Sequence, residues 1–315
     1  MLKTLTITLN PSIDKSISVP TLVADQKLHC GTAAFEPGGG GINVSRAIQK
    51  LGGISECWFL AGGYYGDFLI QLVRQQGLHY KCFPIANETR ECIIAYDETS
   101  RKQYLFDLEG PFVTEHEWQP MLAAIVCEKH RQFLVLSGSV PPGVPQDFYG
   151  QAARLAKANG MQVIADTSGL PLELVLKEGI FLLKPNLREF CLLTGADPDR
   201  VDDIQLKAKA LIHSGACQIV VISLGKNGAF LIGDNYFVHI PAPTVERKST
   251  VGAGDSMVAG LIYQLSNGND ILKAVQYGVG CGAAATIYPG TSLCRKADAE
   301  LFFNCILENQ NYDSF

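Results

Sequence analysis

Short apolar runs rich in β-branched residues recur along the chain, and they constrain the fold more than any other feature. The runs are mostly continuous rather than alternating with polar residues, and they lie at residues 4–9, 132–137, 162–166, 180–183 and 218–223. Continuous runs of this kind are typical of strands that helices cover on both faces. They favour a sheet buried inside the molecule.

Helical patterns separate these runs, at residues 42–51, 66–76, 146–158, 202–214 and 256–265. Alternation of strand and helix with short connections predicts an α/β fold with a mainly parallel central sheet flanked by helices. The chain has 315 residues, of which 47% are apolar and 18% charged, so disorder is excluded for most of it. Because no linker or repeat divides the sequence, we expect a single α/β domain over residues 1–315.

Two segments interrupt this alternation, and each is predicted to form a half-polar hairpin. The strands of the first hairpin are expected at 14–20 and 28–35, and those of the second at 90–96 and 102–108. The central sheet offers no obvious place for them. We therefore expect a small β-sheet lid, built from discontinuous segments at about 14–36 and 88–110.

Composition excludes several classes of protein. A net charge of −5 argues against a nucleic-acid-binding protein, and no stretch approaches the roughly 20 apolar residues of a membrane span. The N-terminus lacks the features of a secretory signal. The ten cysteines show no C-x-x-C pair and sit mostly in apolar segments, which predicts reduced, buried thiols in a cytoplasmic protein. Residues 308–315 are expected to be frayed.

The strongest chemical signal is a turn of small residues at 250–256 that precedes an apolar helix. Such a turn aims several backbone N–H groups at the positive end of the helix dipole, which makes an anion site. Asp255 could then act as a general base on a substrate hydroxyl. It could equally be an ordinary N-terminal helix cap.

A second glycine-rich turn covers residues 36–44, with four consecutive glycines before Asn43. Glycines admit a ligand close to the backbone, and the Asn43 amide offers a donor and an acceptor to a sugar hydroxyl. The alternative is a flexible hinge in which Asn43 only caps the helix. Neither register of the glycines gives G-x-G-x-x-G, which counts against a dinucleotide-binding oxidoreductase.

Three further segments follow predicted strands, where ligands bind in open α/β sheets. Residues 223–228 could face a nucleotide or form a plain turn. In residues 184–189, Asn186 and Glu189 would share one helix face and could order the water shell of Mg²⁺, or they could simply start a helix. Residues 137–143 leave the end of another strand. The motifs of Walker-type NTPases and of protein kinases are absent.

Taken together, these residues resemble the PfkB (ribokinase-like) family of carbohydrate kinases. The resemblance runs from residues 8–14 to 290–294, and the glycine run with asparagine at 38–43 and the VGAGDS run at 251–256 match the family signatures. Within the family, FEPGGGGIN, SGSVPPGV, STVGAGDSM and GTSLC look most like the branch that phosphorylates sugar phosphates. The resemblance therefore implies a ribokinase-like fold and an ATP-dependent sugar-phosphate kinase.

The implied reaction is that of a 6-phosphofructokinase, which converts fructose 6-phosphate and ATP to fructose 1,6-bisphosphate and ADP. Phosphorylation of tagatose 6-phosphate or fructose 1-phosphate is the alternative within the same branch. The alternative that is not an enzyme is a sugar-phosphate sensor built on the same fold. The intact Asp255 and anion loop speak against a sensor, because a sensor need not keep a base.

The resemblance also implies roles for individual residues. Asp255 would be the catalytic base, and the N–H groups of Gly252, Ala253 and Gly254 would form the anion hole for the γ-phosphoryl group. The implied sugar-phosphate contacts are Asp14, Lys27, Gly39, Gly40, Asn43, Arg90 and Ser139. The implied ATP contacts are Lys184, Asn186, Ser223, Gly225 and Gly228. Glu189 and Asn186 would hold Mg²⁺ through water.

Family members often use K⁺, and the positions matching that site here are Ser249, Val251, Ala285 and Gly290. Tyr288 and Ser292 stand where asparagine and arginine are expected, which leaves K⁺ dependence open. Gly40 replaces a lysine of some relatives, and His29 replaces an arginine. A homodimer through the lid is expected, because exposed strand edges otherwise invite unwanted pairing. Across such a dimer, His29 would weaken phosphate binding or make it pH-sensitive.

Overall fold

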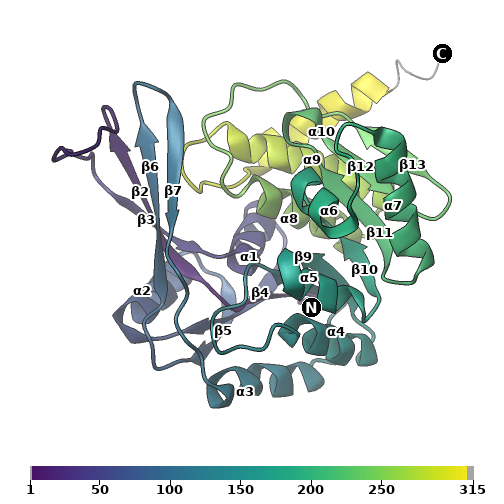
Figure 1. Cartoon of the computed structure of the whole chain (residues 1–315), viewed down its shortest axis with the longest axis horizontal. Helices are drawn as coiled ribbons and strands as arrows, with labels where there is room; N and C mark the ends of the chain where they lie inside the picture. The colour runs from purple at the N-terminus through teal and green to yellow at the C-terminus, as the bar shows by residue number, and fades with distance from the viewer. Residues whose placement is uncertain (1, 311–315) are drawn as a thin grey trace.

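The computed structural model describes residues 2–310, and two sheets stand apart in it (Figure 1). In this part of the chain the larger sheet has nine strands. In spatial order they are β13 (Phe237–Ile240), β12 (Ala229–Ile232), β11 (Cys217–Ser223), β10 (Ile180–Leu183), β9 (Gln162–Asp166), β8 (Phe133–Ser137), β1 (Thr4–Thr8), β4 (Ser55–Ala61) and β5 (His79–Pro84). Neighbours from β5 to β11 are parallel, and only β12 and β13 pair in the antiparallel sense.

Helices cover both faces of this sheet. One face carries α3 (Glu115–Val126), α4 (Phe148–Ala158), α5 (Gly169–Leu176), α6 (Leu187–Thr194) and α7 (Val201–His213). The other face carries α1 (Gly40–Lys50), α2 (Gly63–Gln75), α8 (Ala253–Ser266), α9 (Ile271–Thr286) and α10 (Lys296–Gln310). The predicted fold class, α/β with a mainly parallel central sheet flanked by helices, is confirmed by this three-layer arrangement.

Strand β8 illustrates why the apolar runs are continuous. Successive side chains of a strand point to opposite faces of the sheet. Phe133 and Val135 accordingly pack in the core beneath α1, α8, α9 and α10, whereas Leu134 and Leu136 pack in the core beneath α3 to α7. All four are at most 1% exposed, so an apolar residue is favoured at each of these positions.

The smaller sheet has the order β3–β2–β6–β7 and rises at the left of Figure 1. Its strands are β2 (Ser12–Val19), β3 (Ala34–Gly38), β6 (Arg90–Asp97) and β7 (Lys102–Asp107). Two antiparallel hairpins are joined through β2 and β6, which run parallel with Ser12 opposite Arg90. The second hairpin has the predicted strands.

The first hairpin differs from the prediction, because its second strand begins at Ala34 and not at residue 28. Residues 20–33 form a long, mostly exposed loop instead. Only Gly31 reaches back to the first strand, through its N–H to Ser18 O at 2.9 Å. Gly31 interrupts residues 28–33, and a glycine weakens the interior of a strand because it has no side chain to pack.

Three smaller expectations are also decided by the structure. The ten cysteines are free thiols, but Cys30 and Cys127 are exposed, so burial was wrongly expected for these two. Helix α10 extends to Gln310, so residues 308–310 are helical rather than frayed, and residues 311–315 lie outside the described part. Between residues 2 and 310, no helix has the length and apolar character needed to cross a membrane.

The topology decides where a site can form. From β1 the chain adds β4 and β5 on one side, and it later adds β8 to β11 on the other side. Ligands bind at such a reversal, beyond the carboxyl ends of the strands. The loops after β1, β8, β9, β10 and β11 lie at that edge, and those after β8, β10 and β11 carry the segments 137–143, 184–189 and 223–228 singled out in the sequence.

Candidate active site

The turn before α8 places Asp255 in the first turn of that helix. Gly252 caps the helix with φ = 73°, a left-handed conformation that residues with a side chain rarely adopt. A Cβ at Gly252 would also lie 2.5 Å from Leu293 Cδ2. The helix therefore starts at Ala253, three residues before the predicted start, and the Ala253 N–H makes a long hydrogen bond of 3.4 Å to Thr250 O.

Asp255 meets the other glycine motif through Asn43, which lies in the first turn of α1. Asn43 Nδ2 donates a hydrogen bond to Asp255 Oδ2 at 3.0 Å, although the two residues are 212 positions apart in the sequence. Residues 38–43 and 251–256 thus form one site. The carboxylate lies where α1 and α8 converge, above the ends of the central strands.

Two carboxyl groups at this point have raised pKa values. Burial raises the pKa of Asp255 to about 7, helped by repulsion from Asp166, while the hydrogen bond from Asn43 and the charge of Lys184 work in the opposite direction. Burial also raises the pKa of Asp14, on β2, to about 6. An aspartate whose pKa lies near neutrality is suited to accept a proton from a substrate and to release it again.

Lys184 supplies a cation beside the glycine turn. It follows β10, is 4% exposed, and lies with Nζ 3.0 Å from Asp166 Oδ1. Burial is the largest single influence and would lower its pKa, but Asp166, Glu189 and Asp255 together raise the pKa above its usual value, so the side chain stays charged. A Cβ on Gly254 would lie 3.6 Å from this Nζ. The cation therefore faces the same turn as the helix N–H groups.

A cavity of about 440 Å³ opens on one side of this turn. Its lining contains the predicted residues Asn186, Ser223, Gly225, Gly228, Ala253 and Gly254. It also contains Lys226 and Thr250, which lie within the predicted segments 223–228 and 250–256, and residues that the sequence did not reveal, among them Arg247, Gly282, Ala283 and Thr286. The closely spaced small residues of α9 were a usable signal, but the loop at 242–247 carries no motif.

On the other side of Asp255, the smaller sheet contributes polar groups. Arg90 is 10% exposed and pairs with Asp107, and it donates to Asn10 O from Nε at 3.3 Å and from Nη2 at 3.2 Å. Asn10 in turn donates from Nδ2 to Ser139 Oγ at 3.0 Å. Arg90 and Ser139, from distant parts of the chain, therefore share Asn10 as a neighbour.

Asn10 itself was not singled out in the sequence. Its Oδ1 atom is buried and has no hydrogen-bond partner among the described residues. Its position directly after β1, at the edge where ligands bind, was the available signal.

Gly40 has a steric reason for lacking a side chain. A Cβ there would lie 2.1 Å from Ser137 Oγ and 3.0 Å from Ser137 Cβ. Gly39 precedes it as the cap of α1, at the same edge. The side chain of Ser137 occupies the room that a lysine would need.

Lys27 is a predicted site residue that the fold does not bring into contact with the others. It lies on the exposed loop 20–33, and none of the hydrogen bonds or ion pairs recorded for residues 2–310 joins it to the other site residues. A single copy of the chain therefore gives Lys27 no part in the site.

Asn186 and Glu189 form a reciprocal cap at the start of α6. Asn186 Oδ1 accepts from the Glu189 N–H, and Glu189 Oε2 accepts from the Asn186 N–H, both at 2.9 Å. The described residues contain no group of three or more His, Cys, Asp or Glu side chains that could cage a metal ion. One carboxylate and one amide fit Mg²⁺ held mainly through its own waters and substrate phosphates.

The four residues matched to a K⁺ site lie around one loop. Ser249 Oγ donates to Gly290 O at 2.8 Å and accepts from the Val251 N–H at 3.2 Å. Thr286 O, next to Ala285, accepts from the Ser249 N–H at 3.2 Å. Carbonyl and hydroxyl oxygens of this kind suit a hard monovalent cation.

The two departures from the family pattern lie on the same loop. Tyr288 donates from its hydroxyl to Asp298 Oδ2 at 2.9 Å, and the Arg295 guanidinium lies 3.9 Å from the Tyr288 ring centroid. Ser292 Oγ donates to Pro289 O at 2.9 Å. Tyr288 thus contacts Arg295 and Asp298, close to it in the sequence, and Ser292 contacts Pro289 of the loop itself.

The site combines a helix N-terminus with a buried cation, a cavity and a carboxylate of raised pKa, on a ribokinase-like sheet. These features define a phosphotransferase that acts on an alcohol. Residues 7–298 match the profile of the pfkB family carbohydrate kinases. The chain belongs to this family.

Named relatives are similar over nearly the whole chain. The chain is 38% identical to ATP-dependent 6-phosphofructokinase isozyme 2 of Mycobacterium tuberculosis, covering 96% of this chain and 90% of the relative. The crystal structure of Escherichia coli phosphofructokinase-2 with substrates and products is 34% identical, with a TM-score of 0.93 over 97% of this chain and 100% of that one. The same Escherichia coli protein in complex with potassium is 35% identical, with a TM-score of 0.93 over 98% of this chain and 100% of that one.

Proposed function

We propose that the protein is an ATP-dependent kinase that phosphorylates fructose 6-phosphate to fructose 1,6-bisphosphate. The observation that carries the proposal is the contact between Asn43 and Asp255, which sets a carboxylate of raised pKa between the ATP-sized cavity and the polar groups of the smaller sheet. The names of the Mycobacterium tuberculosis and Escherichia coli relatives support this choice of substrate.

In the proposed reaction, Asp255 accepts the proton of the sugar hydroxyl as its oxygen attacks the γ-phosphorus of ATP. The new O–P bond forms while the bond from the γ-phosphorus to the β,γ-bridging oxygen breaks, and ADP leaves with that electron pair. The N–H groups of Gly252, Ala253 and Gly254 and the cation of Lys184 stabilise the transferred group. Phosphoryl transfer depends mainly on such in-line positioning and charge neutralisation.

The two binding regions divide the substrates between them. We assign ATP to the cavity lined by Asn186, Ser223, Gly225 and Gly228. Asp14, Gly39, Gly40, Asn43 and Ser139 are assigned to the sugar hydroxyls, and Arg90 to the 6-phosphate. Asn10 is added to this group because it touches both Arg90 and Ser139.

Two cations belong to the proposal. Mg²⁺ would be ordered through water by Glu189 and Asn186 and would neutralise the phosphates of ATP. The oxygens around Ser249, Val251, Ala285 and Gly290 would hold K⁺, which agrees with the potassium complex of the Escherichia coli protein.

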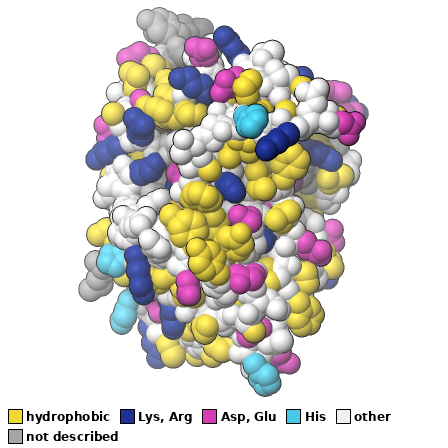
Figure 2. Space-filling view, turned by 90° about the vertical axis from the view of Figure 1, so that its left-hand side faces the viewer, with side chains coloured by type: hydrophobic (Ala, Val, Ile, Leu, Met, Phe, Trp, Pro, Cys, Tyr) yellow, Lys and Arg dark blue, Asp and Glu magenta, His cyan; other side chains and the backbone are white. Residues whose placement is uncertain are grey.

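We further propose that the smaller sheet is a lid and that two copies pair through it. Its edge strand β7 exposes Tyr104, Leu105 and Phe106, with Leu105 52% exposed. Figure 2 shows hydrophobic side chains gathered across the middle of this side of the molecule, with charged residues among and around them. In the pair, Lys27 and His29 of one copy would reach the sugar phosphate of the other. We place the protein in the cytoplasm, where its free thiols stay reduced.

The test is ADP release by the purified protein with ATP and a panel of sugar phosphates. We expect the largest kcat/KM with fructose 6-phosphate. Preference for tagatose 6-phosphate or fructose 1-phosphate would reassign the acceptor within the same chemistry. Binding of these sugars without any turnover would instead favour the sensor.

A further inference from the structure

Helix α1 contains a fully buried arginine one turn after Asn43. The Arg46 side chain is 1% exposed, and its three guanidinium nitrogens donate to four protein groups. Its Nη1 donates to Asn43 Oδ1 at 2.9 Å and to Pro37 O at 3.0 Å. Its Nη2 donates to Glu36 Oε1 at 2.6 Å, and its Nε donates to Gln76 Oε1 at 2.8 Å. Such a set fixes the guanidinium in one place.

This guanidinium decides which way the Asn43 amide points. Arginine has donors and no acceptor, so only the amide oxygen of Asn43 can face it. The amide nitrogen must then point to the opposite side, where it donates a hydrogen bond to Asp255 Oδ2 at 3.0 Å. A flipped amide would set its NH₂ group against the guanidinium and the amide oxygen against the carboxylate. Both of those contacts are repulsive.

We propose that Arg46 is a positioning residue for phosphoryl transfer: it holds the Asn43 amide so that the NH₂ group orients the Asp255 carboxylate toward the substrate hydroxyl. Arg46 touches neither substrate in this arrangement and acts through Asn43. The proposal rests on the proposed function, because it takes Asp255 as the group that accepts the hydroxyl proton.

Arg46 also links the orientation of the Asn43 amide to the position of the smaller sheet. Glu36, its ionic partner, belongs to β3, and its second oxygen accepts a hydrogen bond from Thr291 in the loop after α9. Gly290 of that loop accepts from Ser249, which precedes the glycine turn of α8. The base is therefore held from α1, from β3 and from the 287–295 loop together.

The expected pH effect follows from the groups around Asp255. These are Asn43 on α1, Asp14 on β2, Asp166 at the end of β9 and Lys184 after β10. The hydrogen bond from Asn43 lowers the pKa of Asp255, whereas Asp14 and Asp166 raise it. If Arg46 no longer holds the amide, this hydrogen bond weakens and the pKa of Asp255 rises further.

The principal test is Arg46→Met, measured by kcat, by both KM values and by the pH profile of kcat. Because a misplacement of about 1 Å can cost ~10²-fold in rate, we expect kcat to fall by about 10- to 100-fold. The KM for ATP should change little, and the acidic limb of the profile should move to higher pH. Arg46→Lys keeps the charge but not the forked geometry, so it should recover only part of the rate.

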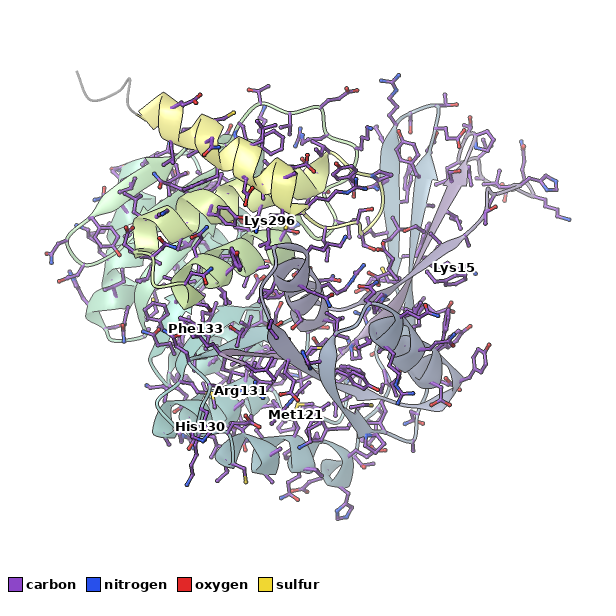
Figure 3. All side chains as sticks on the ribbon, turned by 180° about the vertical axis from the view of Figure 1, so that it is seen from behind. Lys15, Met121, His130, Arg131, Phe133 and Lys296 are labelled. Atoms are coloured by element: carbon purple, nitrogen blue, oxygen red, sulfur yellow. The ribbon has the colours of Figure 1, made fainter. Side chains whose placement is uncertain are left out.

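Arg131→Met is the matched control. Arg131 is also buried, at 9% exposure, and it pairs with Glu56 and Glu128 and donates to Leu2 O at 3.0 Å. It lies at the amino ends of β1 and β4, on the edge of the sheet opposite the site, and Figure 3 shows it far from Lys15 on the smaller sheet. Both substitutions should lower the melting temperature. Only Arg46→Met should move the pH profile.

A double-mutant cycle tests whether Arg46 acts through Asn43. In an Asn43→Ala background, Arg46→Met should reduce kcat little further, because the group it positions is gone. A full additional loss in that background would overturn the proposal. So would an Arg46→Met enzyme whose kcat and pH profile match those of Arg131→Met.

A ¹³C titration of the Asp255 carboxyl separates this inference from the proposed function. The pKa of Asp255 should be higher in Arg46→Met than in the wild type, whatever the substrate is. A wild-type protein that phosphorylates no sugar phosphate would refute the proposed function, and this titration would still decide the role of Arg46. An unchanged Asp255 titration would refute that role even in an active enzyme.

Discussion

The two regions that meet at Asp255 are built differently. On the nucleotide side, the cavity lies within the main fold, and its cation Lys184 is 4% exposed and held by Asp166. On the side of the smaller sheet, Arg90 pairs with Asp107, which is 64% exposed, and strand β7 has an open edge. The first region is complete within one chain. The second exposes apolar and charged groups, which in the proposed dimer lie against the second copy.

The largest effect is expected where the two regions meet. Asp255→Asn should lower kcat by about 10²–10⁴-fold, the usual contribution of a general base, because the amide cannot accept the hydroxyl proton. ATP affinity should be nearly unchanged, since the cavity remains. ADP release and calorimetric titration with ATP measure the two quantities. Asp202→Asn, at an exposed position on α7, is the control and should retain full activity.

Arg90→Ala should affect the binding of the sugar phosphate much more than the binding of ATP. Hydrogen bonds to charged groups contribute about 1.5–3 kcal/mol, so the KM for the sugar phosphate should rise about 10- to 100-fold. The KM for ATP should stay close to that of the wild type. Arg101→Ala, on the turn of the same hairpin, is the control for a lost surface charge. Equal changes in both KM values would show that Arg90 does not serve the sugar side alone.

Phe106→Glu tests whether the smaller sheet needs a second copy. Phe106 is 48% exposed on β7, and a charge there should weaken pairing of the chains. We expect analytical ultracentrifugation to show more monomer and the sugar-phosphate KM to rise several-fold, with a smaller change for ATP. Leu206→Glu, at a 66% exposed position on α7, should change neither. A Phe106→Glu protein that associates and turns over as the wild type does would remove β7 from the interface.

The smallest effect concerns stability. The pKa of Asp255 in the folded protein is about 7, well above the value of 3.8 for a free aspartate. Between these values the folded state binds more protons than the unfolded state, so the contribution of this group to stability falls as pH rises from about 4 to 7. Asp255→Asn should therefore melt a few degrees above the wild type at pH 8, and the gain should shrink as pH falls toward 5.

Asp202→Asn again provides the comparison for the melting curves. Its pKa is lowered by the hydrogen bond from Arg200, so its contribution to stability has the opposite sign. The melting temperature of Asp202→Asn should therefore not rise above that of the wild type at pH 8. Thermal melting followed by circular dichroism at a series of pH values distinguishes the two variants.

Much of the fold could be predicted because each layer leaves a local signal. Strand β8 reads as a continuous apolar run since both of its faces are buried. The strand start expected at residue 28 was wrong, because strand pairing depends on a distant partner and Gly31 weakens the segment before Ala34. The start of α8 was placed three residues late, since the glycine turn conceals the first helical residues.

The site could be predicted where glycines mark a close approach of the backbone, as at residues 38–41 and 252–254. Arg46 gave no such signal, because an arginine on an amphipathic helix normally faces water. It becomes a buried group only when the chain folds and brings Glu36 and Pro37 of β3 and Gln76 at the end of α2 against it. Arg247 in the cavity lining was missed because its place there depends on how distant loops meet.

The most direct test of the central claim is a crystal structure with fructose 6-phosphate and a non-hydrolysable ATP analogue bound together. We predict that the sugar hydroxyl lies within hydrogen-bond distance of Asp255, about 2.6–3.2 Å, and in line with the γ-phosphorus. A structure in which both ligands are bound and the hydroxyl lies beyond the reach of Asp255 would contradict the account.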